Sequence, residues 1–119
     1  MKDVDFLTAN GIDVDHSLEI LGDMDMYNET LNDFVDESKD RIPKIEEYKN
    51  NGDMANYSIL VHAMKSDSKY LGFTILADLS YKHELASKEN NIEFVNNNYE
   101  ILINEANRII DIIEQYLSL

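Results

Sequence analysis

Hydrophobic residues recur along most of this chain at intervals of three and four, the spacing that gathers side chains on one face of an α-helix. The pattern is most regular near the C-terminus. Its apolar stripe there comprises Ile92, Val95, Tyr99, Leu102, Ala106, Ile109, Ile113 and Tyr116. No segment alternates apolar and polar residues as a half-buried strand does. The pattern therefore predicts an all-α protein.

Glycines and capping residues mark where the first helices begin and end. Gly11 and Gly22 enclose a short helix, with Asp13 or Asp15 as its N-cap. A long amphipathic helix follows, from about Asp25 to Asn50. Both helices expose many acidic side chains, which we interpret as solvated faces and helix starts rather than as calcium loops.

Two further features refine the middle of the chain. Pro43 lies inside the long helix and removes one backbone donor, so we expect a bend or a local break near residues 39–42. Asp53 follows a turn and is a good N-cap for a helix over residues 54–71. Gly72 then closes this helix or permits close packing.

The remaining pattern completes the expected topology. Residues 73–88 form a fourth helical unit, and the polar sequence at 88–91 separates it from the last helix. Four substantial helices joined by short turns pack as antiparallel neighbours. We therefore predict one domain over residues 1–119, an antiparallel up-and-down four-helix bundle with an additional short N-terminal helix laid over one end.

Composition limits the chemistry that this bundle can carry. The chain has no cysteine, which excludes thiol nucleophiles, cysteine-ligated zinc and iron–sulfur clusters. Its 24 acidic and 10 basic side chains give a net charge of −14, which disfavours nucleic acid and anionic membrane surfaces as partners. No apolar run approaches the ~20 residues that cross a bilayer. We expect a cytoplasmic protein without a membrane anchor, and a monomer.

The segment 54–82 departs from the acidic balance and contains His62. Its charged side chains are Lys65, Asp67, Lys69, Asp78 and Lys82. On a helical wheel, Tyr57 lies on an apolar face, and His62 points about 140° away from Tyr57. That core face comprises Tyr57, Leu60, Val61, Met64, Ser68 and Leu71. The exposed side around His62 is expected to hold Ser58, Lys65, Ser66 and Lys69, with Ile59 and Ala63 as an apolar shoulder.

An exposed imidazole beside lysines is suited to carrying an anion covalently. Its unperturbed pKa of about 6.5 leaves much of the ring neutral and nucleophilic near pH 7. Lys65 and Lys69 could then hold the negative charges of a phosphoryl group. Spacing alone is equally compatible with a plain solvated histidine. A metal site is not expected, because no second ligand lies at the required spacing on this face.

The run HAMKSDSKYLGF, from His62 onwards, resembles the signature of histidine-containing phosphotransfer (HPt) domains. In that family, the phospho-accepting histidine is followed by lysine at the third position, a small residue at the fourth and glycine at the tenth. Lys65, Ser66 and Gly72 stand at these positions. The N-terminal helices and the turn before residue 54 are also similar, so the likeness covers nearly the whole chain. Ser66 often is glycine in the family, and Asp67 replaces a small or hydroxyl residue.

The resemblance implies a phosphoryl carrier rather than an enzyme. His62 would accept a phosphoryl group from a receiver-domain aspartate and pass it to another receiver, while Lys65 would hold the phosphoryl oxygens. Supporting or docking residues would be Ser58, Ile59, Ala63, Ser66, Lys69 and Gly72. The chain would need no cofactor of its own, since the partner receiver would supply Mg²⁺. Its partners would be response-regulator receiver domains and a hybrid sensor histidine kinase.

The principal alternative is an acidic helical scaffold that binds proteins without phosphotransfer. A helical-bundle hydrolase is less favoured, because no carboxylate pair, nucleophile–base pair or phosphate-cradling glycine loop is evident. Of the other histidines, we expect His83 to be a partly buried structural residue and His16 to lie on the surface. The methionines at 24, 26, 54 and 64 are expected to fill the core.

Overall fold

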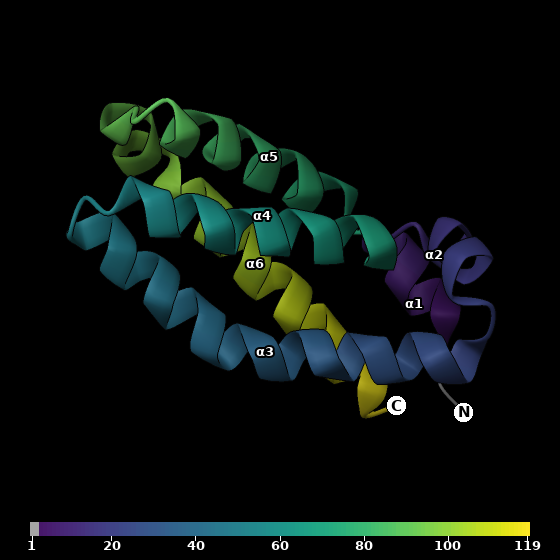
Figure 1. Ribbon diagram of the computed structural model, residues 1–119. Helices are drawn as coiled ribbons and strands as arrows, with labels where there is room; N and C mark the ends of the chain where they lie inside the picture. Colours follow the sequence, from purple (N-terminus) through teal and green to yellow (C-terminus); the bar gives the residue numbers. More distant parts are fainter. Residues whose placement is uncertain (1–2) are drawn as a thin grey trace.

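The computed structural model describes residues 3–119, which form six α-helices (Figure 1). Their bounds are α1 Val4–Ala9, α2 Val14–Leu21, α3 Met24–Asn50, α4 Met54–Leu71, α5 Thr74–Lys88 and α6 Ile92–Leu117. Within this described part of the chain, extended pairing is limited to one isolated bridge between Ile12 and Phe73. The all-α prediction is confirmed, and the expected bounds of α4 are those observed.

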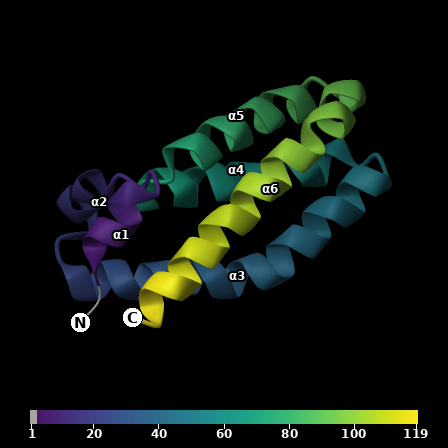
Figure 2. The ribbon, with the colours of Figure 1, turned by 180° about the vertical axis from the view of Figure 1, so that it is seen from behind.

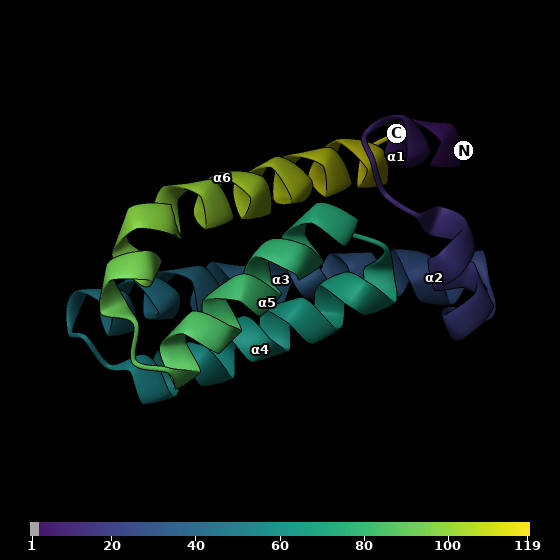
Figure 3. The ribbon, with the colours of Figure 1, turned by 90° about the horizontal axis from the view of Figure 1, so that it is seen from above.

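Helices α3 to α6 form the predicted bundle. Each packs against the next, and α6 returns against α3. Successive helices alternate in direction along the bundle (Figure 1), and the view from behind shows α6 crossing between α5 and α3 (Figure 2). From above, α4 and α5 lie side by side as a pair, with α1 and α2 gathered at one end of the bundle (Figure 3). This arrangement is the antiparallel four-helix topology that short connections favour.

Helix α1 was not predicted, because six residues are too few to show a helical period. Asp3 caps it by accepting from the backbone N–H of Asp5 at 2.9 Å, and Leu7 is its fully buried residue. Arg108 of α6 donates to the backbone oxygen of Asn10 at 3.0 Å, which ties the end of α1 to the last helix. The bundle therefore carries two short N-terminal helices, not one.

Pro43 bends α3 without breaking it. The helix is continuous through residues 39–42, and its axis changes direction in both side views (Figures 1 and 2). Proline removes one N–H donor and crowds the preceding turn, which is a sufficient cause for the bend. Of the two expected outcomes, the bend is observed and the local break is not.

The core is built from the predicted stripes, with a few exceptions. Seven residues of α6 are buried: Val95, Leu102, Ala106, Ile109, Ile112, Ile113 and Tyr116. Ile92 is exposed and Tyr99 is half-buried, so these two residues of the predicted stripe lie at the rim of the core. Met54 and Met64 are buried as expected, whereas Met26 is exposed because it lies on the outer face of α3.

Gly72 fixes the turn between α4 and α5 against the N-terminal segment. Its φ of +81° is left-handed, and its backbone oxygen accepts from the N–H of Asp13 at 2.9 Å. A Cβ added at Gly72 would lie 2.3 Å from the backbone oxygen of Asp13. Both readings of this glycine, helix end and close packing, are therefore confirmed.

We predict that Gly72→Ala lowers the free energy of unfolding by more than about 2 kcal/mol. The left-handed conformation alone disfavours alanine by roughly 1–2 kcal/mol, and the segment around Asp13 must also move. Gly52→Ala is the matched control, since Gly52 has a φ of +68° but no atom of the described residues 3–119 lies within 4 Å of an added Cβ. Urea titration of both variants measures the difference. Equal losses would show that the contact with Asp13 contributes nothing.

Candidate functional site

His62 stands on the outer side of α4, where the helical wheel placed it. Its side chain is 55% exposed. The opposite side of α4 buries Tyr57, Val61, Met64, Ser68 and Leu71, while Leu60 is half-buried. Asp53 caps the start of this helix by accepting from the N–H of Asn56 at 3.2 Å, which fixes the residue at which α4 begins.

The imidazole of His62 is oriented by a buried carboxylate from the neighbouring helix. Nδ1 of His62 lies 2.7 Å from Oε2 of Glu84 on α5, and the Glu84 side chain is only 3% exposed. An ionised carboxylate accepts hydrogen bonds and cannot donate them. Nδ1 therefore carries the proton and donates it to Glu84, which leaves Nε2 as the ring nitrogen that is free to react in the neutral imidazole.

Two lysines complete the partners of Glu84. Lys65 of α4 lies 2.6 Å from Oε1, and Lys88 of α5 lies 2.8 Å from Oε2. Burial by itself raises the pKa of Glu84, but the hydrogen bonds from Lys65, Lys88 and His62 outweigh it and lower the pKa to about 2. Glu84 is thus ionised at neutral pH. The group of two ammonium ions and one carboxylate beside the imidazole carries a net charge of +1.

The expectation that the Lys65 ammonium stands in solvent is wrong. Its side chain is 15% exposed, because it turns toward α5 to pair with Glu84. Its Nζ also lies 5.2 Å from the centre of the Tyr81 ring, a cation–π contact. Contacts with Glu84 and Tyr81 of α5 therefore hold the Lys65 ammonium in place, and Glu84 also contacts the His62 ring.

The other predicted residues divide into surface and interior. Ile59 is 64% exposed, Lys69 is exposed, and Ala63 and Ser66 are half-buried beside His62 on α4. Ser58 is 7% exposed, so its expected place on the open face is wrong. It lies next to Tyr57, on the side of α4 that neighbouring helices cover.

Gly72 and Asp67 both lie away from the imidazole. Gly72 is buried in the α4–α5 turn against Asp13, so its support for the site is architectural. Asp67 pairs with Arg41 of α3 at 2.9 Å. This pairing confirms that the Asp67 carboxylate points away from His62.

Glu84, Lys88 and Tyr81 were missed from the sequence. Glu84 falls within the buried stripe of α5, which includes Ala77, Ser80 and Ser87. An acidic residue in such a stripe signals a partnered carboxylate, because a buried charge is costly without one. Lys88, four residues after Glu84, strengthens that signal. The identity of the partner on α4 required the structure.

His83, adjacent to Glu84, belongs to the interior. It is 1% exposed. Its Nε2 donates to the backbone oxygen of Asn98 at 3.2 Å, and its Nδ1 accepts from the hydroxyl of Tyr57 at 2.8 Å. Burial lowers the pKa of His83, which favours this neutral form. It is more deeply buried than expected, and its contacts are structural. His16 is exposed on α2, as predicted.

The two lysines that pair with Glu84 offer a test of this geometry. We predict that Lys65→Ala lowers the free energy of unfolding by about 1–3 kcal/mol, because it removes a covered partner of a buried charge. Lys88→Ala is the matched control and should lose less than about 1 kcal/mol, since the Lys88 side chain is 60% exposed. Denaturant titration at neutral pH measures both. A larger loss in Lys88→Ala would contradict the observed order of burial.

Neither a metal cluster nor a membrane-spanning helix is found in the described residues. No group of three or more histidine, aspartate and glutamate side chains within residues 3–119 is placed to hold a metal ion. No helix in that range is both long and apolar enough to cross a bilayer. In comparisons with known proteins, no family model, curated protein or solved structure matches this chain.

Proposed function

We propose that this protein is a histidine phosphotransfer carrier, which receives a phosphoryl group on His62 from a receiver-domain aspartate and passes it to another. The observation that supports this most is the bond from Nδ1 of the half-exposed His62 to the buried Glu84. It fixes the tautomer, and within residues 3–119 Nε2 has no hydrogen-bond partner. The sequence resemblance to HPt domains points to the same residue.

The transfer step uses Nε2 as the nucleophile. Its lone pair attacks the phosphorus of the aspartyl phosphate, an N–P bond forms, and the P–O bond to the aspartate breaks with its electrons on the departing carboxylate. No proton leaves the ring, because Nδ1 keeps its own. The ring therefore becomes positively charged, and the Glu84 carboxylate at 2.7 Å stabilises that charge. Reversal of the same step delivers the phosphoryl group to the next aspartate.

Lys65 and Lys88 would stabilise the negative charge of the phosphoryl group on His62. Both Nζ atoms lie within 3 Å of Glu84, which itself contacts the ring. Lys88 is mostly exposed and can turn toward a phosphoryl oxygen, whereas Lys65 is largely fixed. The partner receiver supplies Mg²⁺ and the aspartate in this proposal. The carrier itself would work as a cytoplasmic monomer downstream of a hybrid sensor histidine kinase.

The surface next to His62 suits a protein partner. Ile59, one turn before His62, is 64% exposed, and Ala63, Ser66 and Lys69 continue the same side of α4. An exposed isoleucine gives apolar area to bury, and the small Ala63 and Ser66 side chains allow close approach. We assign receiver docking to this strip of α4.

We predict that incubation with a phosphorylated receiver domain and Mg²⁺ yields an acid-labile, base-stable phosphoadduct on this chain. His62→Gln should abolish it, because the nucleophilic nitrogen is gone. His16→Gln is the matched control and should retain it, since His16 is exposed on a different helix. Phosphate-affinity electrophoresis measures the adduct. Binding of receivers without any adduct would favour the acidic scaffold instead.

We further predict that Glu84→Gln slows phosphoryl acceptance at least about tenfold, because an amide cannot stabilise the charged ring as a carboxylate does. Glu89→Gln on the exposed end of α5 is the control for loss of one negative charge. Single-turnover kinetics measure the rate, and circular dichroism checks the fold. An unchanged rate in a folded Glu84→Gln variant would remove Glu84 from the mechanism.

A further inference from the structure

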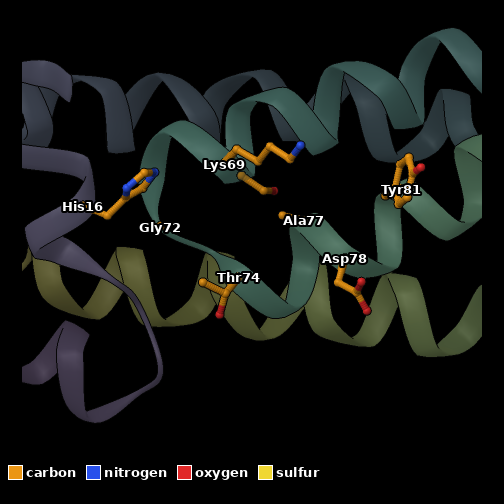
Figure 4. A pocket seen from close by; sticks show the side chains of 8 residues that line it. His16, Lys69, Gly72, Thr74, Ala77, Asp78 and Tyr81 are labelled. Carbon is orange, nitrogen blue, oxygen red and sulfur yellow. The ribbon is translucent and has the colours of Figure 1, made fainter. Parts of the chain in front are cut away.

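A hollow of about 390 Å³ lies where the end of α4 meets the start of α5, beside α2 (Figure 4). We call it the α4–α5 hollow. His16 comes from α2, Ser68 and Lys69 from α4, and Thr74 and Ala77 from α5. Its volume falls at the lower end of the range of small-ligand pockets, about 300–1,000 Å³. The hollow shares Lys69 with the proposed docking strip and Tyr81 with the surroundings of Lys65, but His62 and Glu84 do not line it.

The start of α5 is the only helix start in residues 3–119 without a side-chain cap. The other helices begin after Asp3, Asp13, Asp23, Asp53 and Asn91, and each of these side chains accepts a backbone N–H. Helix α5 begins after Phe73, which has no acceptor in its side chain. The N–H groups of its first turn carry partial positive charge and favour an anion.

Ser68 gives an independent indication of a ligand. It lines the hollow, its side chain is fully buried, and its Oγ has no hydrogen-bond partner in the part of the chain that the structure describes. Its backbone oxygen accepts from the N–H of Phe73 at 2.9 Å, which places Ser68 directly beside the start of α5. Buried hydroxyls are nearly always partnered. A ligand oxygen at this point would satisfy the hydroxyl and the first turn of α5 together.

The walls indicate what else the ligand carries. In Figure 4, His16 and Lys69 lie along one side of the hollow, and Thr74 and Ala77 along the other. Asp78 lies at the far end from His16, and it pairs with Lys82 at 3.2 Å. The methyl group of Ala77 and the ring of Tyr81 offer apolar surface. The Lys69 ammonium on one wall and the apolar surface of Ala77 and Tyr81 suit a ligand with one negatively charged end and an apolar body.

We propose that the α4–α5 hollow binds a small organic monocarboxylate with an aliphatic or aromatic body. The carboxylate lies at the first turn of α5, bonded to its N–H groups and to Ser68, with Lys69 and His16 as positive or donating neighbours. The apolar body lies against Ala77 and Tyr81. This inference does not rest on phosphotransfer, because it involves neither His62 nor Glu84.

The test is a titration of the whole chain with phenylacetate, followed by amide NMR. We expect saturable shifts of the Thr74, Ile75 and Leu76 amides, with little change at Ala55 and Asn56 of the capped α4 start. Two matched probes separate the contributions. We expect 2-phenylethanol, which keeps the body and lacks the charge, and inorganic phosphate, which lacks the body, each to bind at least tenfold more weakly.

Matched serine variants locate the carboxylate. Ser68→Ala should weaken phenylacetate about five- to tenfold, the loss of one hydrogen bond. Ser80→Ala is the control, because Ser80 is also fully buried with an unpartnered Oγ but lies outside the hollow. Ala77→Leu, which fills the hollow, gives a second variant if Ser68→Ala fails to fold, and it should abolish binding.

Three results would overturn the proposal. Absence of saturable shifts at Thr74 to Leu76 would show that no carboxylate binds there. Equal affinity for 2-phenylethanol would show an apolar hollow without an anion site. Equal weakening by Ser68→Ala and Ser80→Ala would show that the serine acts through the fold. Each result leaves the adduct test at His62 unaffected, so the two proposals fail separately.

Discussion

The structure depends on one buried charge, the carboxylate of Glu84 between α4 and α5. An ionised group with 3% exposure is tolerated only when oppositely charged or hydrogen-bonding groups pair with it. Here the partners come from both helices, with His62 and Lys65 on α4 and Lys88 on α5 itself. Since the imidazole takes its orientation from this carboxylate, the geometry at the surface follows from how α4 and α5 pack.

Two adjacent residues of α5, His83 and Glu84, fix the rotation of this helix against its neighbours. His83 and Glu84 are separated by about 100° around the helix. His83 faces the interior and contacts Tyr57 and Asn98, while Glu84 reaches His62. A rotation of α5 about its axis would break both sets of hydrogen bonds at once. The tight turn at Gly72, pressed against Asp13, fixes where α5 starts. The position of the imidazole is therefore set by the interior and by the turn.

Local patterns predicted much of this arrangement, and interhelix contacts account for what they missed. The bounds of α4 follow from Asp53 and Gly72, and the outward direction of His62 follows from periodicity alone. The wheel failed for Lys65 because a long side chain bends toward a charged partner on the next helix, which a single-helix projection omits. It failed for Ser58 for the related reason that neighbouring helices cover more of α4 than its apolar stripe indicates.

The net charge of −14 opposes the gain of a phosphoryl group, but the distance of most acidic side chains from His62 limits that effect under the proposed function. At physiological ionic strength, exposed charges beyond about 8 Å are largely screened. Lys65 and Lys88 lie within 3 Å of Glu84, whose carboxylate contacts the ring, so their attraction is exerted at short range. The distant acidic side chains weaken this attraction little. Under the proposed function they would still disfavour large polyanions such as nucleic acid, whose many phosphates would meet the whole acidic surface. Under the proposed function, an acidic exterior around a small positive site thus favours a single phosphoryl group over extended anions.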